Sequence, residues 1–145
     1  MGSCFMVVEQ TDRYPRRMEY QPETHTFAET PWQSLGHARG VPYPYGWLRG
    51  FGTPPQRHLD VLLVSTEPHE LGDEVPVRLI GVFVRRDGDN KLLALPPERA
   101  ETDYTQLPEG EKELLLRLYP GRYEGEGWFG RERAEAIRRA FAAQA

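Results

Sequence analysis

The stretch Asp87-Gly88-Asp89-Asn90-Lys91-Leu92-Leu93-Ala94-Leu95 decides the fold class, because a turn sequence leads directly into an apolar strand sequence. Asp, Gly and Asn are the residues that tight hairpin turns use. Residues 75–85 before the turn and residues 61–65 further upstream are also rich in β-branched and apolar side chains. We therefore predict three strands here, and we expect residues 75–85 and 91–95 to be joined as a hairpin.

The composition upstream of this centre favours strands and loops. Residues 5–9 are typical of a short strand. Residues 16–21 and 24–29 are typical of the two arms of a hairpin. Residues 31–55 contain five prolines and five glycines. Because proline removes a backbone donor from a strand, we predict a long loop there, of the kind that is functional or held by its aromatic residues.

Downstream, two segments have the spacing of amphipathic helices. Residues 109–119 place Leu114, Leu115 and Leu118 on one face and end before Pro120-Gly121, and residues 131–143 repeat the pattern with Ala, Ile and Phe. Strands followed by helices indicate a single α+β domain over residues 1–145. A small closed or partly closed barrel would hide the strand edges, although periodicity alone does not separate it from an open sheet.

The charge and cysteine content exclude several classes of protein. Eighteen Lys and Arg against 22 Asp and Glu give a net charge of −4, which argues against nucleic acid or an anionic membrane as a partner. Cys4 is the only cysteine and cannot form an internal disulfide. No stretch approaches the roughly 18 apolar residues of a membrane helix. Since we also read no targeting signal, we expect a cytoplasmic protein.

Taken alone, the polar residues around the predicted hairpin have simple structural explanations. Asp87 and Asp89 fit a plain hairpin turn better than a metal site, and Asp60 fits a polar residue at the start of a strand. The four histidines are His25, His37, His58 and His69. Their spacing is not that of zinc ligands, and surface positions explain them.

Several short motifs keep a regular spacing through the middle of the chain. They are Tyr45-Gly46, Asp60-Val61-Leu62, Gly81-Val82, Asp87 and Asp89-x-Lys91-Leu92. Together they resemble the pattern of soluble, family I type inorganic pyrophosphatases. The resemblance implies an α+β fold made of an OB-like five-stranded β-barrel with two packed C-terminal helices. It also implies Mg²⁺-dependent hydrolysis of diphosphate to phosphate and assembly into a homo-oligomer.

The resemblance also assigns roles to individual residues. The positions that hold metal in the family are Glu9, Asp60, Asp87 and Asp89. The positions that contact phosphate are Arg17, Tyr45, Lys91 and Tyr119, and Glu19 matches a further acidic position of the site. The implied ligand is pyrophosphate or another phosphorylated small molecule, with Mg²⁺ as the cofactor.

The chain departs from the family pattern at several positions. Pro55 and Arg57 occupy the first two Asp positions of the acidic motif, and the position of Arg57 is that of the family's general base. Val41 and Pro120 stand in place of a tyrosine and a lysine. Because carboxylates hold Mg²⁺ and a cation repels it, we expect a weakened or partial magnesium site and weak or absent pyrophosphatase activity.

Two alternatives remain open from the sequence. Arg57 is either a solvated loop charge or a side chain that projects into the vacated metal position and pairs with Asp60 or Asp89. The protein is either a divergent phosphohydrolase or a non-catalytic module that binds a phosphate or a nucleotide on the same barrel.

Overall fold

The computed structural model describes residues 3–143, which form eight strands, three α-helices and one 3₁₀ helix. In chain order the elements are β1 (Ser3–Gln10), β2 (Arg16–Gln21), β3 (Thr26–Gln33), α1 (Leu35–Arg39), β4 (Tyr45–Leu48), β5 (Asp60–Leu63), β6 (Glu74–Val84), β7 (Lys91–Leu95), η1 (Tyr104–Gln106), α2 (Glu109–Leu118), β8 (Gly127–Gly130) and α3 (Arg131–Ala143). No helix within residues 3–143 is long and apolar enough to cross a membrane.

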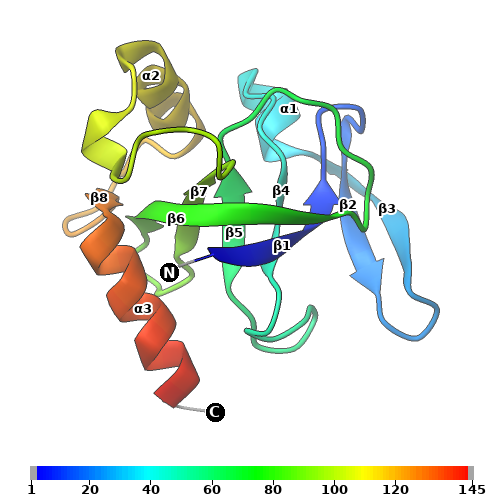
Figure 1. Cartoon of the computed structure of the whole chain (residues 1–145). Helices are drawn as coiled ribbons and strands as arrows, with labels where there is room; N and C mark the ends of the chain where they lie inside the picture. The colour runs from blue at the N-terminus through cyan, green and yellow to red at the C-terminus, as the bar shows by residue number, and fades with distance from the viewer. Residues whose placement is uncertain (1–2, 144–145) are drawn as a thin grey trace.

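Five strands close into a barrel (Figure 1). They follow the order β1-β4-β5-β7-β6, and pairing of β1 with β6 completes the ring. The pairing of β5 with β7 is parallel, and the other pairings are antiparallel. Strand β6 has 11 residues, so that its first part pairs with β1 and its second part with β7 and β8. The predicted five-stranded OB-like barrel with two C-terminal helices is confirmed.

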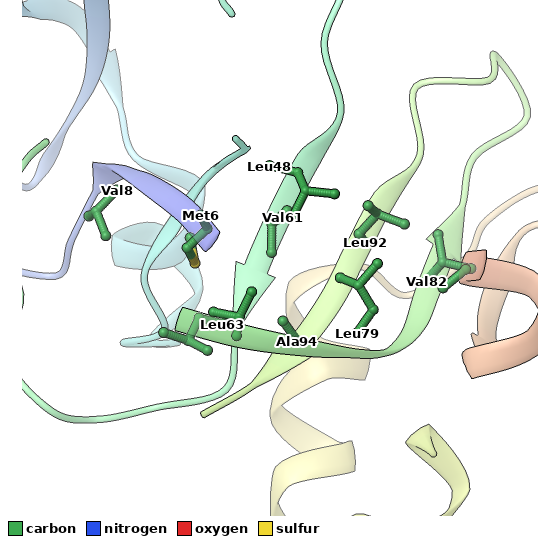
Figure 2. Close-up of a cluster of buried hydrophobic side chains, with 11 residues drawn as sticks. Met6, Val8, Leu48, Val61, Leu63, Leu79, Val82, Leu92 and Ala94 are labelled. Atoms are coloured by element: carbon green, nitrogen blue, oxygen red, sulfur yellow. The ribbon is translucent and has the colours of Figure 1, made fainter. Parts of the chain in front are cut away.

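The barrel interior is filled by apolar side chains from all five strands (Figure 2). In β5, Val61 and Leu63 belong to this inner cluster, while Leu62 belongs to a second cluster that includes Leu115 and Leu118 of α2. Both faces of β5 are therefore buried, which explains why the strand is a continuous apolar run instead of an alternating one. Helix α3 joins the inner cluster through Ala134, as its spacing predicted.

The prediction of an uninterrupted loop over residues 31–55 is wrong. This segment contains the end of β3, helix α1 and strand β4. Ser34 caps α1 by accepting a hydrogen bond from the backbone N–H of His37. Strand β4 lies between β1 and β5, and a Cβ at Gly46 would lie 1.8 Å from the carbonyl oxygen of Val7. Gly46 thus permits the close pairing of two strands, whereas composition alone indicated a loop at this position.

The remaining element boundaries lie close to those predicted. The hairpin of β2 and β3 forms a separate two-stranded sheet beside the barrel, although β3 begins at Thr26 and extends to Gln33 (Figure 1). Helix α2 ends at Leu118, one residue before the predicted end, and α3 has the predicted bounds. Strand β8 was not predicted. It links the helices to the barrel, since Trp128 Nε1 donates a hydrogen bond to the carbonyl oxygen of Leu115.

Candidate functional site

A pocket of about 240 Å³ opens beside the barrel, between β1, the β2–β3 hairpin, α1 and the end of α2. Six of the residues assigned to the site from sequence line it: Glu9, Arg17, Tyr45, Asp89, Lys91 and Tyr119. They come from strands β1, β2, β4 and β7, from the turn before β7 and from the residue after α2, so that only the folded chain brings them together.

Lys91 is the centre of the polar part of this pocket. The parallel register of β5 and β7 places Asp60 opposite Lys91. The ammonium Nζ of Lys91 lies 2.9 Å from Asp60 Oδ2, 3.0 Å from the hydroxyl of Tyr45 and 3.2 Å from Asp89 Oδ2. An ammonium has three N–H donors, so these three contacts use its full donor capacity. Both Lys91 and Asp60 are buried.

The charges of this cluster stabilise one another. Burial by itself would raise the pKa of Asp60, but hydrogen bonds from His58 and Lys91 and their positive charges lower that pKa to about 2. Burial would likewise lower the pKa of Lys91, but the negative charge of Asp60 raises it above its ordinary value. Burial raises the pKa of the Tyr45 hydroxyl well above its ordinary value. The cluster therefore holds an ionised carboxylate, an ammonium and a neutral phenol at neutral pH.

His58 completes the cluster, and its assignment to the surface from sequence is wrong. Its Nε2 lies 2.8 Å from Asp60 Oδ1, and its Nδ1 lies 2.6 Å from the carbonyl oxygen of Gln56. Since a carboxylate and a carbonyl are both acceptors, the two bonds together require the doubly protonated imidazolium. The hydrogen bond to Asp60 accordingly raises the pKa of His58. The only feature of the sequence that could have indicated this contact was the two-residue spacing of His58 and Asp60.

Glu9 and Tyr119 occupy partly buried positions on the pocket wall. Glu9 Oε2 accepts a hydrogen bond of 3.1 Å from the backbone N–H of Tyr20, and burial raises the pKa of Glu9. The ring of Tyr119 stacks on Phe83, with 5.1 Å between the ring centroids. Burial also raises the pKa of Tyr119, so its hydroxyl remains a neutral donor and acceptor at neutral pH.

Four residues assigned from the resemblance do not line this pocket, and one of them, Asp60, reaches it only through its contact with Lys91. Asp87 accepts a hydrogen bond from the backbone N–H of Asp89, so it acts as a turn-forming residue. Glu19 lies on β2, where it pairs with Ala28 of β3. The guanidinium of Arg57 lies over the ring of Phe141, 3.8 Å from its centroid. Within residues 3–143 the ion pairs of Asp60 and Asp89 are with other side chains, and α3 offers Arg57 an aromatic face, so the structure does not support the interpretation that Arg57 pairs with either carboxylate.

Comparison with known proteins agrees with the barrel. The family model for inorganic pyrophosphatase matches residues 6–137 of this chain. The chain belongs to the inorganic pyrophosphatase family. The inorganic pyrophosphatase of Nanoarchaeum equitans is 31% identical over 113 residues, which are 66% of this chain and 71% of that protein. The inorganic pyrophosphatase of Aquifex pyrophilus is 30% identical over 106 residues, which are 61% of this chain and 60% of that protein.

Solved structures of inorganic pyrophosphatases share the fold. The enzyme from Neisseria gonorrhoeae superposes with a TM-score of 0.74 at 23% identity, covering 98% of this chain and 91% of that chain. The enzyme from Thermus thermophilus gives the same TM-score and identity, with 99% of this chain and 91% of that chain covered. The barrel of this pyrophosphatase-family protein is thus the barrel of the family.

The carboxylates of this family member do not form a cage for a metal ion in the arrangement described. Within residues 3–143, no group of three or more His, Cys, Asp or Glu side chains is placed to hold one. Asp60 is engaged by Lys91 and His58, and Asp89 by Lys91. A resident Mg²⁺ needs several oxygen ligands around one point, so this donor set does not fit it while Lys91 keeps its position.

The charges that line the pocket nearly balance. Arg17, Arg85 and Lys91 supply the Lys and Arg cations, and Glu9, Asp12 and Asp89 supply the carboxylates. Three cations therefore face three acidic groups. An anion entering this pocket is attracted by individual cations and not by a strongly positive field.

Proposed function

We propose that this chain is a divergent inorganic pyrophosphatase-like protein, which recognises pyrophosphate or another phosphorylated small molecule beside Lys91 and has little or no hydrolytic activity by the magnesium route of the family. One observation carries the proposal: the ammonium of Lys91 lies between the carboxylates of Asp60 and Asp89. The ammonium group of Lys91 therefore contacts two carboxylates that would otherwise be metal ligands.

The two replaced positions of the acidic motif support weak hydrolysis. Pro55 has no ligand atom in its side chain, and the guanidinium of Arg57 has hydrogen-bond donors but no acceptor. Arg57 also lies on Phe141. Without a metal to lower the pKa of water from 15.7 toward about 7, or a base to take its proton, pyrophosphate lacks an activated nucleophile. A weakened Mg²⁺ site would have to use Glu9, Asp60, Asp87 and Asp89 after displacement of Lys91.

The residues that would hold a phosphate group are present on the pocket wall. Lys91 and Arg17 supply positive charge, and the hydroxyls of Tyr45 and Tyr119 supply neutral hydrogen-bond donors. Positioning groups of this kind bind and orient a substrate, but they do not generate a nucleophile. Binding with slow turnover is the behaviour that this set of side chains supports.

Phosphate release from pyrophosphate in the presence of Mg²⁺ or Mn²⁺ tests the proposal, together with calorimetry of pyrophosphate binding in a chelator. We expect release near background and binding that does not need a metal. Lys91→Met should abolish that binding, and Lys112→Met, which changes the other lysine of the chain, should not. Turnover at the level of family enzymes would overturn the proposal. Complete absence of turnover with retained binding would favour the non-catalytic module.

Two further features of the proposed function stay predictions. We expect a homo-oligomer, which sedimentation of the purified protein would measure. We also expect a cytoplasmic location, which fractionation of the source cells would measure.

A further inference from the structure

We propose that Arg85 is a phosphate-binding residue of this pocket, and that its guanidinium donates two hydrogen bonds to the phosphate group bound beside Lys91. The resemblance to the family assigns no role to Arg85. The inference deepens the proposed function and rests on it, since it assumes that a phosphorylated ligand occupies the pocket. It names a residue that recognises the phosphate group through directed hydrogen bonds as well as through charge.

The first observation is where the turn after β6 places this side chain. Arg85 directly follows β6 and lines the pocket together with Asp89 and Lys91. Its backbone is held on both sides, because its N–H donates a hydrogen bond of 2.9 Å to Asn90 Oδ1 and its carbonyl oxygen accepts one of 3.0 Å from the N–H of Gly88. The side chain of Arg85 therefore starts from a fixed point beside the pocket.

The second observation is that the protein does not use the donors of this guanidinium. Nε lies 3.9 Å from Asp87 Oδ1 and Nη1 lies 3.8 Å from Asp89 Oδ2, which are distances of ion pairs and too long for hydrogen bonds. Within residues 3–143, the hydrogen bonds of Arg85 are those of its backbone. Arg99 differs, because four hydrogen bonds of 2.7–3.1 Å join its guanidinium to two glutamates. The five N–H donors of Arg85 are therefore available to a ligand.

The third observation is that the two ion pairs of Arg85 can be exchanged for a phosphate at little cost. The side chain of Arg85 is 39% exposed, and those of Asp87 and Asp89 are 63% and 56% exposed. Long ion pairs in water contribute little to stability, because solvent screens them. Two parallel N–H donors of a guanidinium match two oxygens of a phosphate, and this contact is stronger and more directional than either ion pair.

The fourth observation is that Arg85 and Lys91 lie close together. Both approach one carboxylate oxygen, Asp89 Oδ2, with Lys91 Nζ at 3.2 Å and Arg85 Nη1 at 3.8 Å. Burial raises the pKa of Tyr119, and the positive charges of Lys91 and Arg85 oppose that rise, so both cations act on the same hydroxyl. Lys91 already uses its three donors within the protein, so it attracts a phosphate by charge, whereas Arg85 can donate hydrogen bonds without giving one up.

Calorimetry in a chelator with pyrophosphate and with inorganic phosphate tests the role of Arg85. Arg85→Met should weaken binding roughly tenfold, since it removes hydrogen bonds to a charged group. Arg85→Lys keeps the charge but not the planar pair of donors, so it should recover only part of this loss. Arg86→Met is the matched control, because the guanidinium of this exposed neighbour lies over the ring of Tyr123 and does not line the pocket. It makes the same change in net charge and should alter the affinity by less than about twofold.

The same measurement in Asp89→Ala separates direct contact from an effect through Asp89. If Arg85 acts only by neutralising the carboxylate of Asp89, the removal of that carboxylate also removes the effect of Arg85→Met. We expect the loss in Asp89→Ala to be of the same size, roughly tenfold, as in the unchanged protein. Normal binding by the double variant relative to Asp89→Ala would overturn the proposal.

The outcomes separate this proposal from the proposed function. If neither pyrophosphate nor inorganic phosphate binds to the unchanged protein, both are wrong. If one of them binds, and Lys91→Met abolishes binding while Arg85→Met leaves it intact, the proposed function stands and the role of Arg85 is wrong. Equal losses in Arg85→Met and Arg86→Met would also overturn that role, because they would reflect net charge and not a contact.

Discussion

The ammonium of Lys91 lies 2.9 Å from Oδ2 of Asp60, and both side chains are buried. The two residues are 31 positions apart in the chain and face each other because β5 and β7 pair in parallel register. A charge pair of this kind links the stability of the barrel to the polar end of the pocket. Removing one partner leaves the other charge buried, which costs more than the pair contributes as a whole.

Lys91→Met should therefore lower the free energy of unfolding by about 3 kcal/mol, because the Asp60 carboxylate keeps only His58 as a charged partner. Lys91→Met combined with Asp60→Asn should be less destabilised than the sum of the single changes by about 1 kcal/mol or more. Urea denaturation of the four proteins measures this coupling. Strictly additive effects would show that the two side chains do not interact.

Asp89→Ala should strengthen the binding of pyrophosphate in the absence of metal. Asp89 takes one of the three donors of Lys91 and adds a negative charge to the pocket wall. Removal of a charge at about 4 Å in a well-hydrated site corresponds to roughly fivefold in affinity. Calorimetry in a chelator measures it. Asp87→Ala is the matched control, because this exposed carboxylate of the same turn does not line the pocket, and an equal gain there would contradict the explanation.

The stability of the protein should depend on pH through His58 and Asp60. The hydrogen bond to Asp60 raises the pKa of His58, so its contribution is complete below its ordinary pKa of 6.5 and is lost as the pH rises through the higher folded value. The pKa of Asp60 falls from 3.8 to about 2, so its contribution is complete above 3.8 and is lost as the pH falls toward 2. Stability from this pair should be greatest between these limits.

Thermal unfolding as a function of pH checks this dependence. His58→Gln should remove the loss of stability above pH 6.5, because its amide does not titrate. His69→Gln is the control, since no hydrogen bond or ion pair within residues 3–143 joins His69 to Asp60. If the thermal stability of His58→Gln still declines as the pH rises, the decline is caused by another group.

Gly46→Ala should disrupt the barrel, because the added Cβ would lie 1.8 Å from the carbonyl oxygen of Val7. The neighbouring atom is backbone, so β1 and β4 would have to separate, at a cost of about 4 kcal/mol or more. Gly110→Ala in α2 is the comparison, since its Cβ would meet nothing within 4 Å. That change should leave the thermal midpoint unchanged or slightly higher. Similar midpoints for both variants would contradict the close approach of the strands.

The local patterns of the sequence predicted six of the eight strands, two of the three α-helices and the family. The turn at Asp87-Gly88-Asp89-Asn90, the apolar runs on both sides of it and the helix over residues 131–143 are formed by short-range preferences, and each lies where it was predicted. The fixed spacing of motifs from Tyr45 to Leu92 named the family because a shared barrel keeps those distances along the chain. These features need no knowledge of which strand pairs with which.

Strand register and helix docking determined the arrangement of the site, and neither can be predicted from a local sequence pattern. The strand at residues 45–48 was hidden by prolines and glycines, because its pairing with two neighbours depends on the approach permitted by Gly46. His58 contacts Asp60 because the loop before β5 places its ring beside the carboxylate at the start of that strand. Arg57 turned to Phe141 because the C-terminal helix returns to that loop. The sequence by itself determined most strands and helices through preferences that act over a few residues, and the spacing of its motifs determined the family and implied its barrel. Only the tertiary structure placed Lys91 against Asp60 and Arg57 against Phe141, because each of these contacts joins segments tens of residues apart.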